Sequence, residues 1–236
     1  MNPIRVDIWS DVVCPFCYIG KKRLEHVAAE AGITLDIHWH SFELDPNAPA
    51  RHNSNNTERL AKKYGRSYAN MEQMERNVAA MAAEEGIDFQ WQKAQSGNTF
   101  DAHRLIHFAA SKGLANEAKE ALCYAYMTEG VAIGERANVQ LVAQRIGLNA
   151  DEVKAVLNSD AFAVEVRQDE EIARSQLQVS GVPFFVFNQR LGLSGAQPRD
   201  IFFQALQQAQ TLDVAEVAPD SNAAECNDDS CEIPAK

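Results

Sequence analysis

The feature that most constrains this chain is a pair of cysteines near the amino terminus, Cys14 and Cys17, with two residues between them. Residues 4–9, just before the pair, alternate apolar and polar positions and include β-branched side chains, which predicts a β-strand. Residues 19–31, just after it, carry apolar side chains at helical spacing. The pair is therefore expected where a strand turns into a helix.

A helix start favours thiol chemistry, because the first turn presents unpaired N–H groups and the positive end of the helix dipole to a thiolate. Cysteines in such positions have pKa values of roughly 3.5–7.5, below the ordinary value of about 8.5. Pro15 suits the first helical position, where no backbone donor is lost. One helical turn brings the two sulfurs together. We expect Cys14 to be the exposed attacking thiolate and Cys17 the inner thiol that resolves a mixed disulfide.

The chain has 236 residues, 46% of them hydrophobic, which suits one large domain or a domain with a sizeable insertion. Its formal net charge of −11 disfavours a nucleic-acid partner. No apolar run reaches membrane-spanning length, and the start does not have the pattern of a secretory signal. The five cysteines are an odd number, which argues against a secreted disulfide scaffold. We therefore expect a cytoplasmic protein with no membrane partner.

The two ends of the chain carry the predicted strands. A strand over 33–40 would complete a right-handed parallel βαβ unit with the first strand and helix. Late in the chain, the pattern predicts one strand over 181–187 that Pro183 opens, a tight turn at 188–189, a partner strand over 190–194 and a helix over 198–208.

Helices dominate the region between. They are expected over 57–64, 68–85, 101–112, 116–128, 138–146, 151–157 and 161–179. The sequence therefore predicts an α/β fold with a large helical insertion. Residues 1–46 and 176–212 would form one discontinuous domain, residues 47–175 the insertion, and residues 213–236 an acidic C-terminal arm.

Two histidine pairs have spacings that could suggest metal ligands, but neither is expected to form a metal site. His38 and His40 share a strand face but have no third ligand nearby, and His103 and His107 lie one helical turn apart without the acidic residue of a zinc-protease helix. Cys123 lies in a helical run and is interpreted as a buried, inert thiol. We expect no bound metal.

Three segments, residues 11–25, 98–105 and 180–185, together resemble the DsbA-type branch of the thioredoxin superfamily, and within it the cytoplasmic FrnE-like oxidoreductases. The resemblance spans about residues 4–210. It implies a thioredoxin-like fold with a large all-helical insertion. It also implies protein or peptide thiols and disulfides as partners and no cofactor beyond the redox-active disulfide, with glutathione or thioredoxin as candidate electron donors.

The resemblance also assigns the substrate site. The superfamily has a cis proline facing the disulfide, which would place Pro183 beside Cys14 and let the backbone of Val182 pair with an extended substrate. A trans proline that only protects the start of a strand is the alternative.

Pro15 and Phe16, between the two cysteines, complete the predicted substrate-binding residues. The periplasmic oxidant of the family has histidine where this chain has Phe16. Phenylalanine offers a thiolate neither charge nor a hydrogen bond, so we expect a less oxidising disulfide. A reductase or isomerase role is then at least as well supported as an oxidase role.

The arm carries a second pair, Cys226 and Cys231, with four residues between them. Some FrnE-like proteins have such a pair, which implies a second redox centre that exchanges with the first. The neighbouring acidic residues disfavour thiolates, which suits a shuttle better than a primary attacking group. A structural disulfide and a zinc ion shared by four cysteines are the alternatives.

The sequence therefore predicts a cytoplasmic thiol–disulfide oxidoreductase. The alternative is a glutathione-dependent isomerase or transferase, because 2-hydroxychromene-2-carboxylate isomerases and kappa-class glutathione transferases resemble the same fold and first motif. Those enzymes generally have serine at the position of Cys14. A binding or chaperone module without catalysis is a third reading, and no pattern in the chain predicts its oligomeric state.

Overall fold

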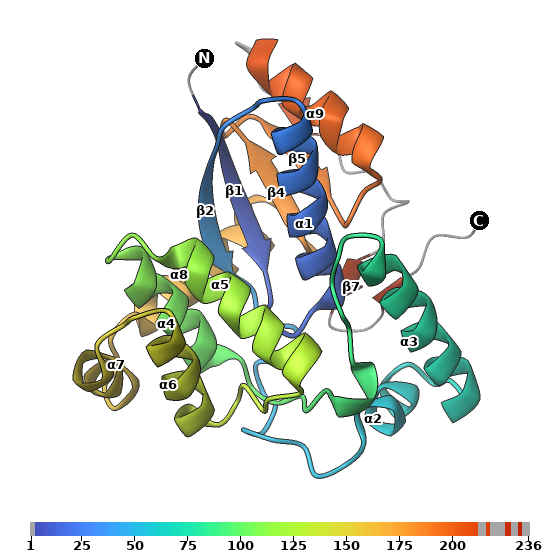
Figure 1. Ribbon diagram of the computed structural model, residues 1–236, viewed down its shortest axis with the longest axis vertical. Coiled ribbons are helices and arrows are strands. Elements are labelled where there is room, and N and C mark those ends of the chain that lie inside the picture. The colour runs from blue at the N-terminus through green and yellow to red at the C-terminus, as the bar shows by residue number, and fades with distance from the viewer. Residues whose placement is uncertain (1–2, 212–215, 218–224, 228–230, 233–236) are drawn as a thin grey trace. The chain divides into compact units, whose positions relative to one another are not determined.

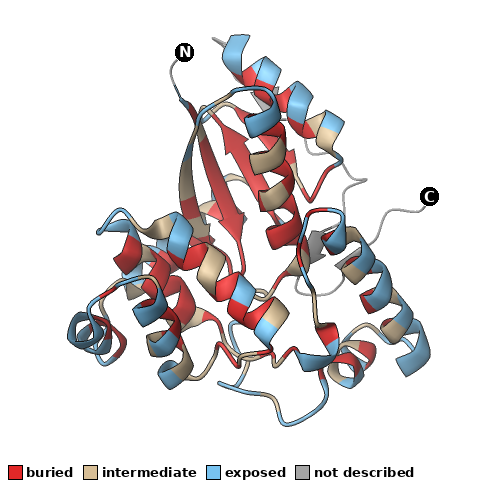
Figure 2. Ribbon diagram, viewed as in Figure 1, coloured by how far each residue is buried: buried red, intermediate tan, exposed pale blue. Residues whose placement is uncertain are grey.

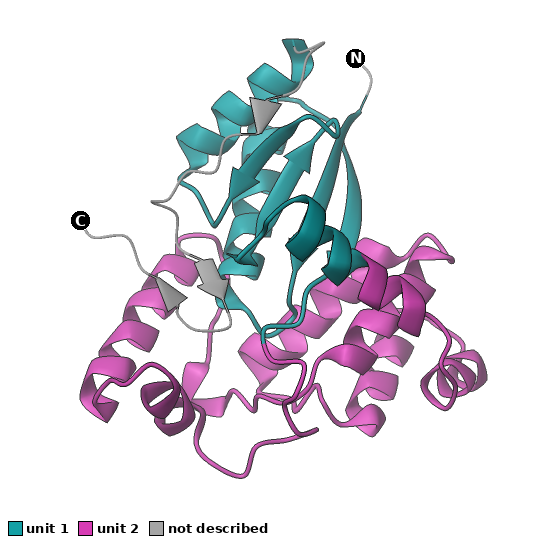
Figure 3. Ribbon diagram, turned by 180° about the vertical axis from the view of Figure 1, so that it is seen from behind, with its two compact units in different colours: residues 1–44, 169–236 teal, residues 45–168 magenta. Residues whose placement is uncertain are grey.

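A computed structural model describes residues 3–211, 216–217, 225–227 and 231–232. It divides into two compact units (Figure 3). Unit 1 comprises residues 1–44 and 169–236, and unit 2 comprises residues 45–168. The sequence places the corresponding divisions at 46/47 and 175/176. The described strands of the arm belong to unit 1.

Unit 1 is built on a mixed sheet (Figure 1). In spatial order its strands are β2 (Leu35–Ser41), β1 (Ile4–Ser10), β4 (Phe184–Phe187), β5 (Leu191–Ser194) and β6 (Glu216–Val217). β1 pairs in parallel with β2, as the predicted βαβ unit requires, and antiparallel with β4. Helices α1 (Pro15–Glu30) and α9 (Arg199–Thr211) contact each other, and α9 contacts β1, β4 and β5. The thioredoxin-like fold is confirmed.

The core of unit 1 lies along the central strands, which are buried almost throughout (Figure 2). Ile8 of β1 stands opposite Trp39 of β2 on one side and Phe185 of β4 on the other. Phe185 meets Phe202 of α9 edge to face, with ring centroids 5.0 Å apart. The aromatic run after Pro183 therefore forms a central strand and anchors the last helix.

The prediction of a single strand over 181–187 is wrong. The chain forms β3 (Gly181–Val182), then β4 from Phe184, and the two belong to different sheets. Pro183 separates them because proline has no N–H to donate to a ladder. β3 pairs with β7 (Glu225–Asn227), which pairs with β8 (Cys231–Glu232). A small second sheet thus begins immediately before the proline.

The predicted tight turn between β4 and β5 is confirmed. Asn188 and Gln189 both have positive φ, 48° and 57°. Left-handed residues of this kind are typical of short β-hairpin loops, and here the Arg190 N–H donates to the Phe187 carbonyl at 3.0 Å. The loop is one residue longer than the predicted turn, because residues 188–190 lie between the paired strands. The turn sets the β4–β5 register, in which Phe187 stands opposite Leu191.

Unit 2 is helical, and α8 continues from it into unit 1. The α-helices are α2 (Asn56–Lys63), α3 (Tyr68–Ala83), α4 (Phe100–Ala110), α5 (Ala115–Tyr124), α6 (Arg136–Arg145), α7 (Ala150–Leu157) and α8 (Ala163–Glu171). Short helical segments lie at Trp91–Lys93, Ala125–Glu129 and Ile172–Gln176, the last two of the wide π type. The predicted helix over 161–179 is therefore too long: it ends at Gln176, before Gln178 takes a positive φ of 55°.

Arg104 ties the insertion together. It is almost fully buried in α4, donates to the carbonyls of Ala161, Val156 and Ser159, and pairs with Asp101 at 2.8 Å. A buried guanidinium is tolerated only when its donors are satisfied. The motif over 98–105 therefore has a packing role in unit 2.

In the part of the chain that the structure describes, no helix is both long and apolar enough to cross a membrane.

Candidate redox site

Cys14 is the N-cap residue, immediately before the first residue of α1. Its backbone is extended, with φ −86° and ψ 114°, no side chain caps the helix, and Pro15 occupies the first helical turn. That turn contains no acidic residue. A thiolate on Cys14 would therefore face the backbone N–H groups of the first turn and the positive end of the helix, with no competing carboxylate in the turn.

Asp11 holds the loop that carries Cys14. Its carboxylate accepts a hydrogen bond from the Leu44 N–H at 2.8 Å, and its carbonyl accepts a longer one from the Cys14 N–H at 3.4 Å. Asp11 is itself buried. The loop between β1 and α1 is thereby fixed to the residues that follow β2. Asp11 is the first residue of the 11–25 segment, and the sequence pattern of that segment does not predict this role.

Both cysteines of the first pair are buried: Cys14 is 0% exposed and Cys17 is 1% exposed. The expectation that Cys14 is exposed is therefore wrong. A helix start favours a thiolate but does not fix how much of the sulfur other segments cover. Phe16 is also fully buried, whereas Pro15 is half-buried.

The late proline lies at this site. The Val182–Pro183 peptide is cis, as the resemblance implies. The Cys14 Sγ lies 3.7 Å from the Val182 carbonyl oxygen, within the range of a weak thiol hydrogen bond. Two segments that lie 168 residues apart in the sequence thus meet at one sulfur.

Gly20 permits this approach. A Cβ on Gly20 would lie 3.1 Å from the Phe185 ring and 3.3 Å from the Pro183 ring. Both distances are tighter than ordinary side-chain contacts, so a side chain at residue 20 would require the Phe185 or Pro183 ring to shift by a few tenths of an ångström. A glycine inside a helical pattern is the sequence signal that could have identified it.

The backbone of Cys226 and of Cys231 lies in the described strands β7 and β8, whereas residues 228–230 between them lie outside the described residues. The backbone of Cys226 stands opposite Val182 in the β3–β7 ladder and opposite Cys231 in the β7–β8 ladder. The backbone therefore brings Cys226 to the residue that contacts Cys14. The redox role of the pair stays a prediction.

The other candidate ligands do not join this site. Cys123 is buried in α5, as predicted. His38 bonds to Asp36 at 2.9 Å. Among the described residues, no three His, Cys, Asp or Glu side chains gather where they could hold a metal.

His40 belongs to a charged cluster instead. Its two ring nitrogens lie 2.9 Å from Asp7 and 2.7 Å from Asp169, and its ring stacks on Trp9 with centroids 4.2 Å apart. Burial opposes a charged ring, but the hydrogen bonds and charges of the two carboxylates prevail and raise the pKa of His40 to about 9. Burial likewise opposes ionisation of Asp7, but His40 and Arg5 lower its pKa to about 2. The cluster joins β1, β2 and Asp169.

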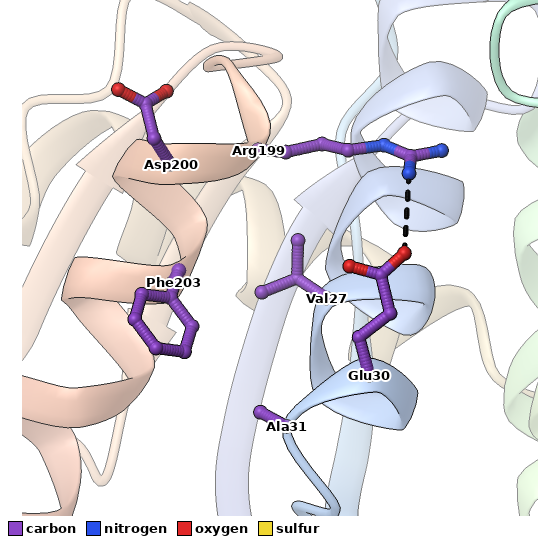
Figure 4. A pocket seen from close by; sticks show the side chains of 6 residues that line it. All are labelled: Val27, Glu30, Ala31, Arg199, Asp200 and Phe203. Carbon is purple, nitrogen blue, oxygen red and sulfur yellow. Dashed lines mark hydrogen bonds and ion pairs between the residues drawn. The ribbon is translucent and has the colours of Figure 1, made fainter.

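A surface pocket lies between the end of α1 and the start of α9 (Figure 4). It is lined by Val27, Glu30, Ala31, Arg199, Asp200 and Phe203. Arg199 reaches Glu30 across it at 3.4 Å. Cys14 immediately precedes α1 whereas Glu30 ends it, so this pocket is not part of the cysteine site.

A cysteine pair at a helix start, with its first sulfur against the carbonyl that precedes a cis proline, is the arrangement expected of a thioredoxin-like fold. The chain belongs to the DsbA-like thioredoxin domain family, whose model matches residues 5–207. The resemblance to the DsbA-type branch is thereby confirmed.

Two individual proteins are similar to this chain over most of its length. A solved structure of a probable DsbA oxidoreductase from Streptomyces coelicolor is 36% identical, with a TM-score of 0.83, and the match covers 98% of this chain and 100% of that one. The uncharacterized protein YwbO of Bacillus subtilis is 24% identical over 88% of this chain and 98% of its own length.

Two more distant structures share the fold. A 2-hydroxychromene-2-carboxylate isomerase is 17% identical with a TM-score of 0.63, over 86% of this chain and 95% of that one. The cytosolic disulfide reductase DsbM of Pseudomonas aeruginosa, solved with glutathione, is 16% identical with a TM-score of 0.56, over 88% of this chain and 100% of that one.

Proposed function

We propose that this protein is a cytoplasmic thiol–disulfide oxidoreductase that acts on protein or peptide disulfides through Cys14 and Cys17. The observation that carries the proposal is the position of Cys14: it immediately precedes α1, and its sulfur lies 3.7 Å from the carbonyl of Val182, next to the cis Pro183. The odd number of cysteines and the fold shared with a cytosolic reductase support the location.

In the reductive direction, the Cys14 thiolate attacks one sulfur of a substrate disulfide. A bond forms between Cys14 and that sulfur, and the other substrate sulfur leaves as a thiolate that takes up a proton. Cys17 then loses its proton and attacks the Cys14 sulfur, which releases the second substrate thiol. The substrate has gained two electrons, and Cys14 and Cys17 have become a disulfide. Two thiols of glutathione, or the dithiol of a thioredoxin, would restore the reduced pair.

Val182 would orient the substrate. An extended peptide that pairs with the backbone of β3 would bring a cysteine next to the Cys14 sulfur. Pro15 and Phe16 would line the same end of α1. With phenylalanine in place of a charged or hydrogen-bonding residue, the reverse, oxidising direction has little thiolate stabilisation to draw on. Reduction or isomerisation is therefore the direction we favour.

The direct assay is reduction of insulin with dithiothreitol. We expect Cys14→Ala to reduce turnover to the uncatalysed rate, because the attacking sulfur is gone. Cys123→Ala, which removes a buried sulfur in the other unit, is the matched control and should retain activity. Equal turnover by the parent and Cys14→Ala would end the proposal.

We also propose that Cys226 and Cys231 exchange electrons with the first pair. The opposition of Cys226 and Val182 supports this, because it brings the arm to the site. In the exchange, a Cys226 thiolate would attack the oxidised first pair and Cys231 would resolve the mixed disulfide, leaving Cys14 and Cys17 reduced and the arm oxidised. Cys226→Ser should then slow turnover and shift the potential of the first pair. Unchanged values for both would refute the relay.

A glutathione-dependent isomerase is the second candidate, because the isomerase noted above shares the fold. Isomerisation would need no resolving thiol. Activity on a chromene carboxylate that survives Cys17→Ser, together with glutathione binding, would favour it. Loss of insulin reduction in the same variant favours the oxidoreductase.

A further inference from the structure

The strand position beside Val182 is already filled by the chain itself. β7, residues 225–227, pairs antiparallel with β3, so that Asn227 stands opposite Gly181 and Cys226 opposite Val182. β7 also contacts α1, the helix that Cys14 immediately precedes, and Figure 1 shows it beside that end of the helix. The arm thus lies where an extended substrate would pair.

A strand edge accepts one partner at a time, because each backbone N–H and C=O on that edge enters one ladder. We propose that β7 is an intramolecular occupant of the substrate-strand position, and that it must leave before a protein disulfide can reach Cys14. The inference deepens the proposed function by naming a regulation of the same site.

The burial of Cys14 agrees with a closed site. Disulfide exchange requires the attacking sulfur to approach the substrate sulfur directly. A sulfur that is 0% exposed cannot do so until a segment near it moves. The Val182 carbonyl is 3.7 Å from that sulfur, and β7 pairs with the same residue. Release of β7 therefore frees backbone next to the buried sulfur.

The arm is suited to reversible release. β7 has three residues and β8 has two, and a two-stranded hairpin of that size is marginal by itself. β6 pairs with β5 of the main sheet and so tethers the arm. A tethered segment competes at an effective concentration on the order of millimolar. A substrate must then bind well enough to displace the arm, so the arm raises the apparent dissociation constant of weak peptide ligands.

The test measures alkylation of Cys14, which does not depend on any enzymatic activity. Full-length protein with Cys226→Ser and Cys231→Ser is kept reduced with a phosphine and treated with iodoacetamide, and labelling is followed at each cysteine by peptide mass spectrometry. Asn227→Pro is added to break the ladder, because proline removes an N–H from β7. Asn227→Ala is the matched control, because it keeps that N–H.

We expect Asn227→Pro to increase the alkylation rate of Cys14 at least tenfold, and Asn227→Ala to leave it within twofold of the background protein. Cys123, buried in the other unit, should stay unreactive throughout. Equal Cys14 rates in the proline and alanine variants would overturn the inference. If Cys123 also reacts, Asn227→Gly replaces the proline variant, because glycine weakens a strand without removing a donor. A threefold increase in the alkylation rate of Cys14 is then expected, and a rate equal to that of Asn227→Ala would overturn the inference. A rise at Cys14 without insulin reduction would refute the proposed function and leave the occupancy by β7 standing.

Discussion

At the scale of single residues, the candidate redox site depends on how the loop before α1 is held. Asp11 is buried and accepts the Leu44 N–H, so it links the Cys14 loop to the end of β2. These contacts position the loop that carries Cys14.

Replacing Asp11 separates its acceptor role from its charge. Asp11→Ala should lower the free energy of unfolding by about 1–3 kcal/mol, because it leaves the Leu44 N–H without its acceptor. Asp11→Asn keeps an acceptor oxygen and should cost less than half as much. Urea denaturation of both variants measures the difference, and equal losses would mean that the charge, not the hydrogen bond, matters.

The His40 cluster makes stability depend on pH. The folded-state pKa of His40 is raised from 6.5 to about 9, so its contribution is complete below pH 6.5 and is lost as the pH rises through 9. The pKa of Asp7 is lowered from 3.8 to about 2, so its contribution is present above pH 3.8 and is lost as the pH falls through 2. Between about pH 4 and 6.5, both contribute.

The prediction is a fall in the free energy of unfolding of up to roughly 3 kcal/mol between pH 6.5 and about pH 9.5. Asp7, Asp169 and Arg5 are the charged groups of the cluster, and the pKa values of Asp7 and Arg5 lie outside this range. His40→Gln should flatten the profile. His38→Gln, on the same strand but bonded only to exposed Asp36 in the contacts described, should not. Urea denaturation midpoints across this pH range measure the fall in stability. A fall that persists in His40→Gln would contradict the assignment of the pH dependence to His40.

The candidate site residues were predictable from the sequence, and the residues that hold them in place were not. Cys14, Cys17 and Pro183 stand out because spacing and flanking patterns mark them in the sequence. Gly20 and Asp11 act through contacts with residues far away in the chain, such as Phe185 and Leu44. The burial of Cys14 has the same origin, since it depends on segments that local patterns do not place.

At the scale of elements, Pro183 determines how residues 181–187 are divided into strands. The aromatic run has one continuous β pattern, which is why the sequence predicts one strand. The missing N–H of proline divides it, and the two residues before the proline join a different sheet. The π segments at Ala125–Glu129 and Ile172–Gln176 extend helices. The spacing of hydrophobic residues in the sequence does not distinguish such segments from regular α-helix.

The β4–β5 turn offers a test at this scale. Gln189 has a φ of 57°, which costs a residue with a side chain about 1 kcal/mol relative to glycine. Gln189→Gly should therefore raise the free energy of unfolding by about 0.5–1 kcal/mol. Gln207→Gly, at an exposed position in α9, should lower it by a similar amount. Destabilisation by both substitutions would show that Gln189 makes a contact worth more than its backbone strain.

At the scale of the whole molecule, the chain joins a thioredoxin-like unit, assembled from both ends of the sequence, to a helical unit inserted in its middle. This organisation follows from the order of the patterns, with strands at the ends and helices between. Sequence patterns do not identify the strands with which the arm pairs. Its strands are short, and their pairing with β5 and β3 depends on edges that exist only in the folded unit.

The central claim is that Cys14 attacks a disulfide and Cys17 resolves the product. The most direct measurement is to trap the mixed disulfide: the Cys17→Ser variant, with Cys226→Ser to remove a competing thiol, is mixed with a peptide disulfide and analysed by mass spectrometry. We predict one peptide attached through Cys14 that a reductant releases, and no adduct when Cys14→Ser is added. An unmodified Cys14, or attachment only at another cysteine, would contradict the claim.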